Sequence, residues 1–157
     1  ELARRIQATR AAKRPTLRTP RRVFDLLHAR LADLEQETFL ALHLDGKHRL
    51  RALRLVSIGT LTTSLVHPRE VFRDAVRSSA AALIVVHNHP SGDPEPSGED
   101  LAVTRRLQAS GDLLGIPLLD HVILAANSFL SLRTRMDFDA KPRPSEVRGA
   151  STCRSCG

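Results

Sequence analysis

Two histidines and an aspartate in the middle of the chain have the residue types and the spacing of a metal site. His87 and His89 open the stretch "HNHPSGDPEPSGED" (residues 87–100), and Asp100 ends it. Residues two apart in a strand share a face, and their Cα atoms lie about 6.6 Å apart, so both imidazoles can reach one ion. Two histidines, one carboxylate and a water form a common catalytic zinc sphere, in which the pKa of the water falls to about 7. These residues predict metal-assisted hydrolysis.

A second interpretation of the same stretch involves no metal. Ser97 and Asp100 stand three residues apart before an expected helix, which is the spacing of a capping box. Under this interpretation both side chains bind only amides at the helix end, and the histidines are hydrogen-bonded surface residues at a strand end. Two histidines in register with a following carboxylate favour the metal site, but the residues alone leave both interpretations open.

Three predicted elements must bring these side chains together. "ALIVV" (82–86) is a short, continuous apolar run, typical of a strand covered on both faces, and we expect it to extend into the histidines. Pro90 cannot donate a ladder hydrogen bond and ends the strand, and "SGDPEPSG" forms a loop that turns the chain back. A helix is expected from Ser97 to about Gly111, with Asp100 in its first turn, where the carboxylate can meet the two rings.

The rest of the chain alternates between strand and helix patterns. Thr19 followed by Pro20 starts a helix with the apolar stripe Val23, Leu26, Leu27, Leu31 and Leu34. A helix that begins at Pro68 has a face predicted to be buried, made of Val71, Phe72, Ala75 and Val76. Strands are predicted at 38–44, 50–59, 116–124 and 128–132, with a hairpin turn at "DGK", an extended piece at 63–66 and a helix at 1–12. The pattern indicates an α/β fold, in which helices pack on a mixed β-sheet.

Composition narrows the class of protein. The 157 residues suffice for one domain, and 3% aromatic residues, with no Trp or Tyr, leave Leu, Val, Ile and Ala to form the core. No apolar stretch reaches the roughly 20 residues that span a bilayer, and the first residues lack the apolar middle of a secretory signal. Cys153 and Cys156, the only cysteines, indicate no disulfide framework, and one such pair does not make a zinc finger. We expect a cytoplasmic protein with no membrane partner.

The net charge of +7 comes entirely from the beginning of the chain. Residues 1–22 carry eight Lys or Arg and one acid, whereas residues 23–157 carry sixteen residues of each sign. A basic arm of this kind binds phosphates without reading a base sequence, and its affinity falls with salt. A solvated helix and linker explain the same charges, and the sequence leaves both interpretations open.

Longer motifs resemble a known family. His87-x-His89, seven further residues and Ser97-x-x-Asp100 match the JAMM signature of the JAB/MPN metalloprotease-like domains without a gap. The words "HPREVF" (67–72), "HNHPSGDPEPSGED" and "LLDHVIL" (118–124) resemble the bacterial RadC family, and the resemblance covers roughly residues 20–135. It implies a JAB/MPN fold similar to cytidine deaminases, with a mixed β-sheet sandwiched by helices. It also implies one Zn²⁺ per chain, held by the two histidines and the aspartate of the signature.

The resemblance also implies catalytic roles. In JAMM peptidases a glutamate on an earlier element is the general base, and the serine of the signature stabilises the oxyanion, so Ser97 takes the second role. Glu37, just before the first strand, is our prediction for the base, and Glu70 is its rival. Glu70 lies in the first turn of the Pro68 helix, where an acid is expected simply to complement the helix dipole. Asp120 and His121 are interpreted either as partners that orient a ligand histidine or as a strand-end pair that binds nearby backbone.

These observations predict a zinc-dependent hydrolase that cleaves peptide or isopeptide bonds in a protein or peptide substrate. The alternative is a DNA-repair-associated nucleic-acid-binding or scaffold module with a structural or vestigial metal site, in which residues 1–22 contact phosphates. RadC proteins carry a helix-hairpin-helix domain before the JAB domain. We therefore expect residues 1–19 to be a basic helix and linker left from it, residues 20–136 to be the JAB/MPN domain, and residues 137–157 to be a disordered tail.

Overall fold

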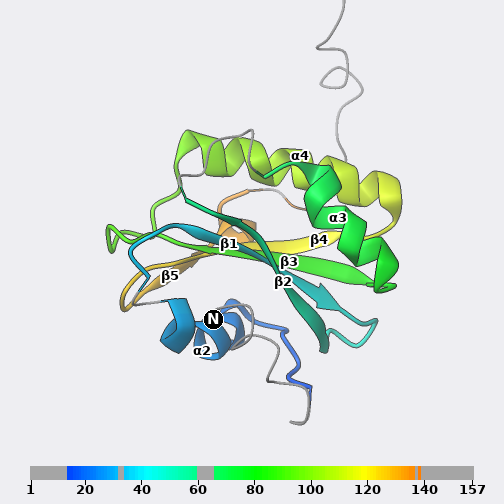
Figure 1. Ribbon diagram of the computed structural model, residues 1–157, viewed down its shortest axis with the longest axis horizontal. Coiled ribbons are helices and arrows are strands. Elements are labelled where there is room, and N and C mark those ends of the chain that lie inside the picture. Colours follow the sequence, from blue (N-terminus) through cyan, green and yellow to red (C-terminus); the bar gives the residue numbers. More distant parts are fainter. Residues whose placement is uncertain (1–13, 32–33, 60–65, 137, 139–157) are drawn as a thin grey trace, which may run out of the picture.

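The computed structural model describes residues 14–31, 34–59, 66–136 and 138, and its centre is a five-stranded mixed sheet (Figure 1). The strands are β1 (Thr38–Leu44), β2 (Leu50–Ile58), β3 (Ala82–Asn88), β4 (Leu118–Leu124) and β5 (Phe129–Ser131). They lie side by side in the order β2-β1-β3-β4-β5, and among these pairs only β3 and β4 are parallel. The predicted helix 1–12 and nearly all of the extended piece at 63–66 fall outside the described residues.

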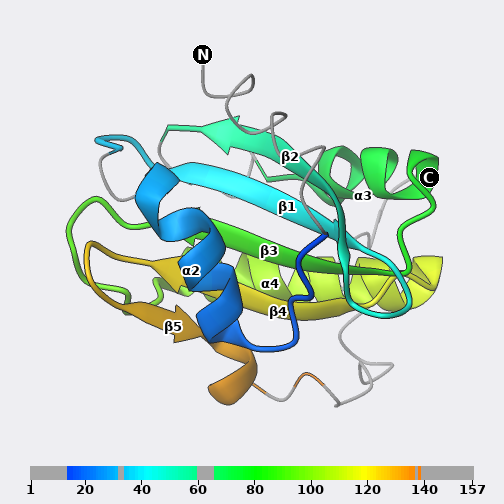
Figure 2. The same ribbon diagram turned by 90° about the horizontal axis from the view of Figure 1, so that it is seen from below.

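Helices cover both faces of the sheet. Helix α2 (Pro20–Leu31) lies on one face, and α3 (Pro68–Arg77) and α4 (Gly98–Leu114) lie on the other, as Figures 1 and 2 show from two sides. A short 3-10 helix, η2 (Leu132–Thr134), follows β5. This arrangement confirms the predicted α/β fold with a mixed sheet between helices. Within the described residues, no helix is both long and apolar enough to cross a membrane.

The two central strands explain why the sequence shows continuous apolar runs there. Every residue of β1 and of β3 is buried. Because side chains alternate along a strand, Leu40 and Leu42 of β1 join the core under α2, whereas Phe39 and Ala41 join the core under α3 and α4. The sheet thus has an apolar layer on each face, and polar side chains within it need a partner or a function.

One irregularity in β4 decides which way a later histidine points. Leu83 of β3 pairs with Leu118, but the next residue, Ile84, pairs with Asp120, so β4 contains one extra residue at Leu119. An extra residue of this kind is a β-bulge, and it shifts the alternation of the side chains that follow it. His121 therefore shares the α4 face with Leu118, although the two are three residues apart.

Two sequence predictions about helices were wrong in detail. Val76, predicted to face the core, is 56% exposed, because α3 packs through the narrower stripe of Val71, Phe72 and Ala75 and leaves Val76 on its outer side. Helix α4, predicted to end near Gly111, continues to Leu114 and ends at Gly115, whose φ of 69° is the left-handed conformation that glycine adopts most easily. The predicted strands begin and end within two residues of the observed ones, whereas the helix that starts at Pro20 ends at Leu31, before the predicted stripe residue Leu34.

Gly111 has a packing role inside α4 rather than a capping role. A Cβ at this position would lie 2.6 Å from the carbonyl oxygen of Ile116 and 3.3 Å from the amide nitrogen of Leu118. The absence of a side chain therefore lets the end of α4 pack directly against the chain that enters β4.

We predict that Gly111→Ala lowers the free energy of unfolding by about 1–3 kcal/mol, because the backbone of residues 116–118 has no room to retreat. The clash outweighs the roughly 1 kcal/mol that alanine gains in a helix. Thermal unfolding monitored by circular dichroism measures the change. Gly46→Ala is the control, since no atom lies within 4 Å of a Cβ built there. A Gly111→Ala protein as stable as the wild type would contradict this packing role.

Candidate metal centre

Three side chains from two neighbouring elements converge at the end of the sheet. His87 is the penultimate residue of β3, His89 follows the strand, and Asp100 lies in the first turn of α4. The Nε2 atoms of His87 and His89 are 2.8 Å apart, and Asp100 Oδ1 lies 3.2 Å from His87 Nε2. Asp100 Oδ2 lies 3.6 Å from His89 Nε2, and the ligand atoms of all three residues fall within 4.8 Å of one another. The structure thus brings together the three predicted metal ligands.

A chain of hydrogen bonds behind His87 determines which of its nitrogens carries the proton. The hydroxyl of Thr104 donates to the backbone carbonyl of Asp100 at 2.6 Å, so it can only accept from His121 Nδ1, which is also 2.6 Å away. Burial lowers the pKa of both His121 and His87, which favours the neutral form of each ring. His121 Nε2 therefore accepts a hydrogen bond from His87 Nδ1 at 2.8 Å, and His87 Nε2 keeps a lone pair that points into the site.

His89 is oriented independently with the same result. Its Nδ1 lies 2.8 Å from the backbone carbonyl oxygen of Asp93, which can only accept, so Nδ1 donates. The lone pair of the neutral ring is then on Nε2, which faces His87. Proline and glycine in the loop after β3 fold it back so that the carbonyl of Asp93 reaches the ring.

Two lone pairs that face each other across 2.8 Å require a positive charge between them. That charge is either a proton or a metal ion. The carboxylate of Asp100, which is 2% exposed, adds a negative charge to the same point. A set of two imidazole nitrogens and one carboxylate oxygen matches the donor set of zinc, so the residues present fit the ion that the sequence predicts.

Ser97 holds Asp100 in place. Its amide and its hydroxyl both donate to Asp100 Oδ2 at 2.7 Å, and its hydroxyl oxygen accepts from the amide of Asp100 at 3.1 Å. The capping box predicted as an alternative to the metal site is therefore present, and it serves the site. It fixes Oδ2 and leaves Oδ1 directed at His87 Nε2.

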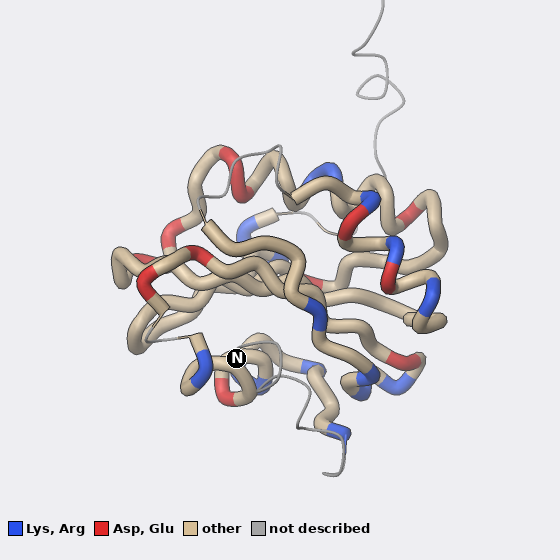
Figure 3. The backbone as a smooth tube through the Cα atoms, viewed as in Figure 1, with Lys and Arg blue, Asp and Glu red and all other residues tan. Residues whose placement is uncertain are grey.

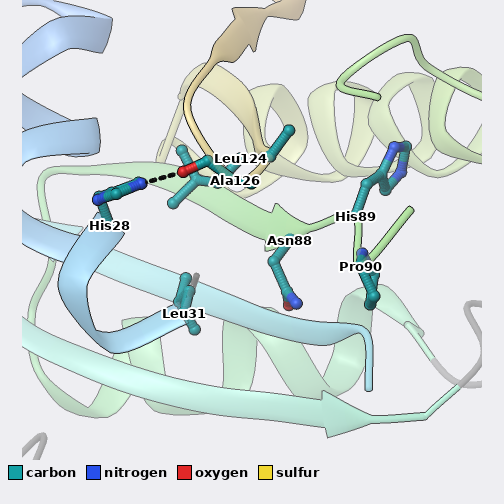
Figure 4. A pocket seen from close by; sticks show the side chains of 8 residues that line it. His28, Leu31, Asn88, His89, Pro90, Leu124 and Ala126 are labelled. Carbon is teal, nitrogen blue, oxygen red and sulfur yellow. Dashed lines mark hydrogen bonds between the residues drawn. The ribbon is translucent and has the colours of Figure 1, made fainter. Parts of the chain in front are cut away.

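Glu37 lies close to the same point, just before β1. The ladder between β1 and β3 ends with Phe39 opposite His87, two residues after Glu37, and the Glu37 carboxylate is near enough to act electrostatically on both His87 and His89. Asn88 holds the approach to β1, because its Oδ1 accepts from the amide of Thr38 at 2.8 Å and its Nδ2 donates to the carbonyl of Gln36 at 3.2 Å. Figure 4 shows that Asn88 and His89 point to opposite sides of the strand end; His28 of α2 hydrogen-bonds the Ala126 carbonyl on the Asn88 side.

An open cleft of roughly 460 Å³ reaches two of the three converging residues, whereas His87 is buried behind them. Glu37, His89 and Asp100 line this cleft, and the other lining residues are Ser91, Asp93, Glu95, Ser97 and Glu99. Glu70 is not among them and instead pairs with Arg69 and Arg73 on α3. Of the two glutamates considered for the general base, the structure places Glu37 at the cleft.

Other polar residues divide between the site and the scaffold. Phe39 stacks at 5.9 Å on His87 and meets His121 edge-on at 5.5 Å, which packs both rings. Asp120 lies on the other face of β4, where it accepts from the Ser131 hydroxyl at 2.7 Å and ties β4 to β5. His121 therefore contacts a predicted ligand histidine, as the first interpretation of the sequence had it. Asp120 instead binds groups of the neighbouring chain segment, as the second interpretation had it. Thr104 was not predicted, since one threonine inside a helix gives no signal in the sequence.

We predict that Thr104→Val and His121→Ala each weaken zinc binding by about 10- to 100-fold, because His87 loses the partner chain that holds its Nε2 lone pair toward the ion. Competition with a chromogenic chelator measures the affinity. Thr134→Val makes the same chemical change at an exposed position away from the cleft and serves as the control. If both site variants bound zinc as tightly as the wild type, the Thr104–His121–His87 hydrogen bonds would have no role in orienting the ligand.

Zinc affinity is also expected to weaken as the pH falls. Asp100 raises the pKa of His89 despite partial burial, whereas the pKa of Asp100, which burial alone would raise, is lowered by the neighbouring His87, His89 and Ser97. The carboxylate therefore stays ionised, and a proton on His89 competes with the ion. One displaced proton gives about a tenfold loss of affinity per pH unit below the raised pKa of His89. Calorimetric titration in buffers of different ionisation enthalpy counts this proton, and an affinity constant between pH 5.5 and 8 would refute the competition.

Comparison with known proteins gives the family. Residues 17–137 match a family described as a RadC-like JAB domain. Similar relatives include UPF0758 proteins of Geotalea uraniireducens, 52% identical over 135 residues, and of Desulforamulus reducens, 50% identical over 135 residues. These alignments cover 86% of this chain and 59% and 60% of the two relatives, so the chain spans about three fifths of their length. On this match the chain belongs to the RadC family of JAB domains.

Proposed function

We propose that this domain is a zinc-dependent hydrolase of the JAMM type, which cleaves peptide or isopeptide bonds in a protein or peptide substrate. The observation that carries the proposal is the meeting of two imidazole lone pairs and one carboxylate beside an open cleft, whose lining includes His89, Asp100 and Glu37. A purely structural zinc site more often closes with four protein ligands. Among the described residues only three such ligands converge here, and the cleft leaves room for solvent and substrate.

Zinc in this site would supply a Lewis acid and lower the pKa of a water bound to it to about 7. Glu37, half-buried at the cleft, accepts the proton of the attacking water and delivers it to the leaving amine. Such a shuttle needs a carboxylate within hydrogen-bond reach of the water. The presence of Glu37 in the cleft lining beside His89 and Asp100 supports this role.

Ser97 is the proposed donor to the oxyanion of the tetrahedral intermediate. In the structure its hydroxyl donates to Asp100 Oδ2, so the hydroxyl must rotate toward the substrate to take this role. Its amide keeps its own hydrogen bond to Oδ2 during that rotation, and Asp100 therefore remains anchored.

A nucleic-acid-binding module remains a prediction from the sequence alone. Residues 1–13 of the basic segment 1–22 lie outside the described residues. The two cysteines, Cys153 and Cys156, also lie outside them. Two of its described arginines have partners within the chain: Arg21 pairs with Asp25, and Arg22 donates to the carbonyl of Thr16. Contact between this segment and DNA is tested by the salt dependence of duplex binding with and without residues 1–13.

The proposal predicts that Glu37→Gln keeps one zinc per chain but lowers hydrolysis by at least about 100-fold, because glutamine cannot accept the proton. Zinc content is measured by plasma mass spectrometry, and hydrolysis is measured as release of fluorescent peptides from labelled casein. Glu70→Gln, which removes a carboxylate outside the cleft, is the matched control and retains both properties. A Glu37→Gln protein with undiminished hydrolysis would exclude Glu37 as the base.

A further inference from the structure

We infer that the substrate segment entering the cleft is cationic, a stretch of protein that carries Lys or Arg beside the scissile amide. This inference rests on the proposed function and adds the substrate class to it. It follows from the charges that surround the three converging ligands, of which only Glu37 has a part in the proposed chemistry.

The described lining of the cleft is acidic. Five carboxylates line it, and no Lys or Arg is among the lining residues that the structure describes. They are Glu37, Asp93, Glu95, Glu99 and Asp100. Asp93 and Glu95 come from the loop after β3, Glu99 and Asp100 from the first turn of α4, and Glu37 from the approach to β1. Three separate segments thus direct negative charge at one opening.

This acidity contrasts with the rest of the chain, whose net charge is +7. Figure 3 shows acidic segments gathered where β3 ends and α4 begins, while most basic segments lie on the right-hand side and below. A cleft lined by one sign of charge focuses the field and raises the local concentration of ligands of the opposite sign. The cleft therefore favours a cationic ligand even though the protein as a whole repels one.

A bound metal ion does not neutralise the lining. A divalent ion offsets two of the five negative charges, and Arg135 offsets a third through its pair with Glu95. Asp93 and Glu99 lie outside the group that holds the ion, and both are exposed to solvent. Their charges are free to act on whatever segment lies across the ion.

The rim already binds a guanidinium from the chain itself. Arg135, which follows η2, donates from Nη1 and Nη2 to the two carboxylate oxygens of Glu95, each at 3.3 Å. Two parallel contacts of this kind are the preferred geometry for arginine with a carboxylate. The pair is exposed on both sides, with 54% and 58% of the side chains accessible, so a substrate arginine can reach or replace it.

The same charges oppose nucleic acid at this cleft. A phosphate backbone carries one negative charge for each nucleotide, and acidic side chains at the opening repel it. Hydrolysis of a phosphodiester is therefore disfavoured at the candidate centre, whatever the basic segment 1–22 binds elsewhere.

The test uses two fluorescein-labelled twelve-residue peptides of glycine and alanine, one with four lysines and one with four glutamates, added to the zinc-loaded chain. Fluorescence anisotropy measures binding at low and at physiological salt, and mass spectrometry scores cleavage of the same peptides. The site variant is Asp93→Asn with Glu99→Gln. The control is Asp25→Asn with Asp112→Asn, which changes the net charge equally at exposed positions on α2 and at the far end of α4.

We expect the lysine peptide to bind the wild type more tightly than the glutamate peptide, and its affinity to fall with salt. The site variant is expected to lose about 3- to 30-fold of this affinity and the control less than about twofold, because only the site variant removes charges from the lining of the cleft. Equal binding of both peptides, binding of neither, or equal losses in the two variants would overturn the inference. Binding of the lysine peptide with no cleavage would support the inference and count against the proposed hydrolase.

Discussion

The direction of one hydroxyl hydrogen determines the properties of the whole site. The Thr104 hydroxyl donates to the carbonyl of Asp100, so His121 must donate to Thr104 and His87 must donate to His121. The Nε2 of His87 is left with a lone pair that faces the lone pair of His89 across 2.8 Å. Nothing but a proton or a cation stabilises that contact, and the buried carboxylate of Asp100 favours the cation with the higher charge. The candidate metal centre is therefore oriented by Thr104 and His121, which are not among its three predicted ligands.

Three features of the backbone maintain this arrangement. The bulge at Leu119 turns His121 to the face of the sheet that carries His87. The antiparallel pairing of β1 with β3 ends at Phe39 opposite His87, and Asn88 holds the residues before β1, so that Glu37 lies at the cleft. The capping box at the start of α4 fixes the carboxylate of Asp100 through Ser97. Each feature also has an ordinary structural role in a bulge, a ladder or a helix end, so the fold and the site are stabilised by the same contacts.

Spacing along the chain predicted the parts of the site that are close together in the sequence. Glu37 and His121, which come from other strands, were named only through the family resemblance, and Thr104 was not predicted. His87, His89 and Asp100 lie within one strand–loop–helix unit, where side-chain alternation and helix-start residues predict that they converge. Thr104 and His121 are seventeen residues apart, and their contact depends on a bulge for which the sequence carries no turn residue. The prediction that Val76 is buried was wrong for a related reason, because helical periodicity identifies the apolar face of α3 but not how wide the buried part of that face is. Gly111 was predicted to mark the end of the helix, but it lies inside α4, at a point where two backbone segments pack closely together.

The central claim is that His87 Nε2, His89 Nε2 and one oxygen of Asp100 bind a single zinc ion that also keeps a solvent ligand. Anomalous diffraction at the zinc absorption edge, from crystals of the zinc-loaded chain, tests it most directly. We expect one anomalous peak per chain between these three atoms, with a water completing the coordination. A peak at another position, or zinc-loaded crystals with no peak at this point, would contradict the claim and leave the two histidines joined by a proton.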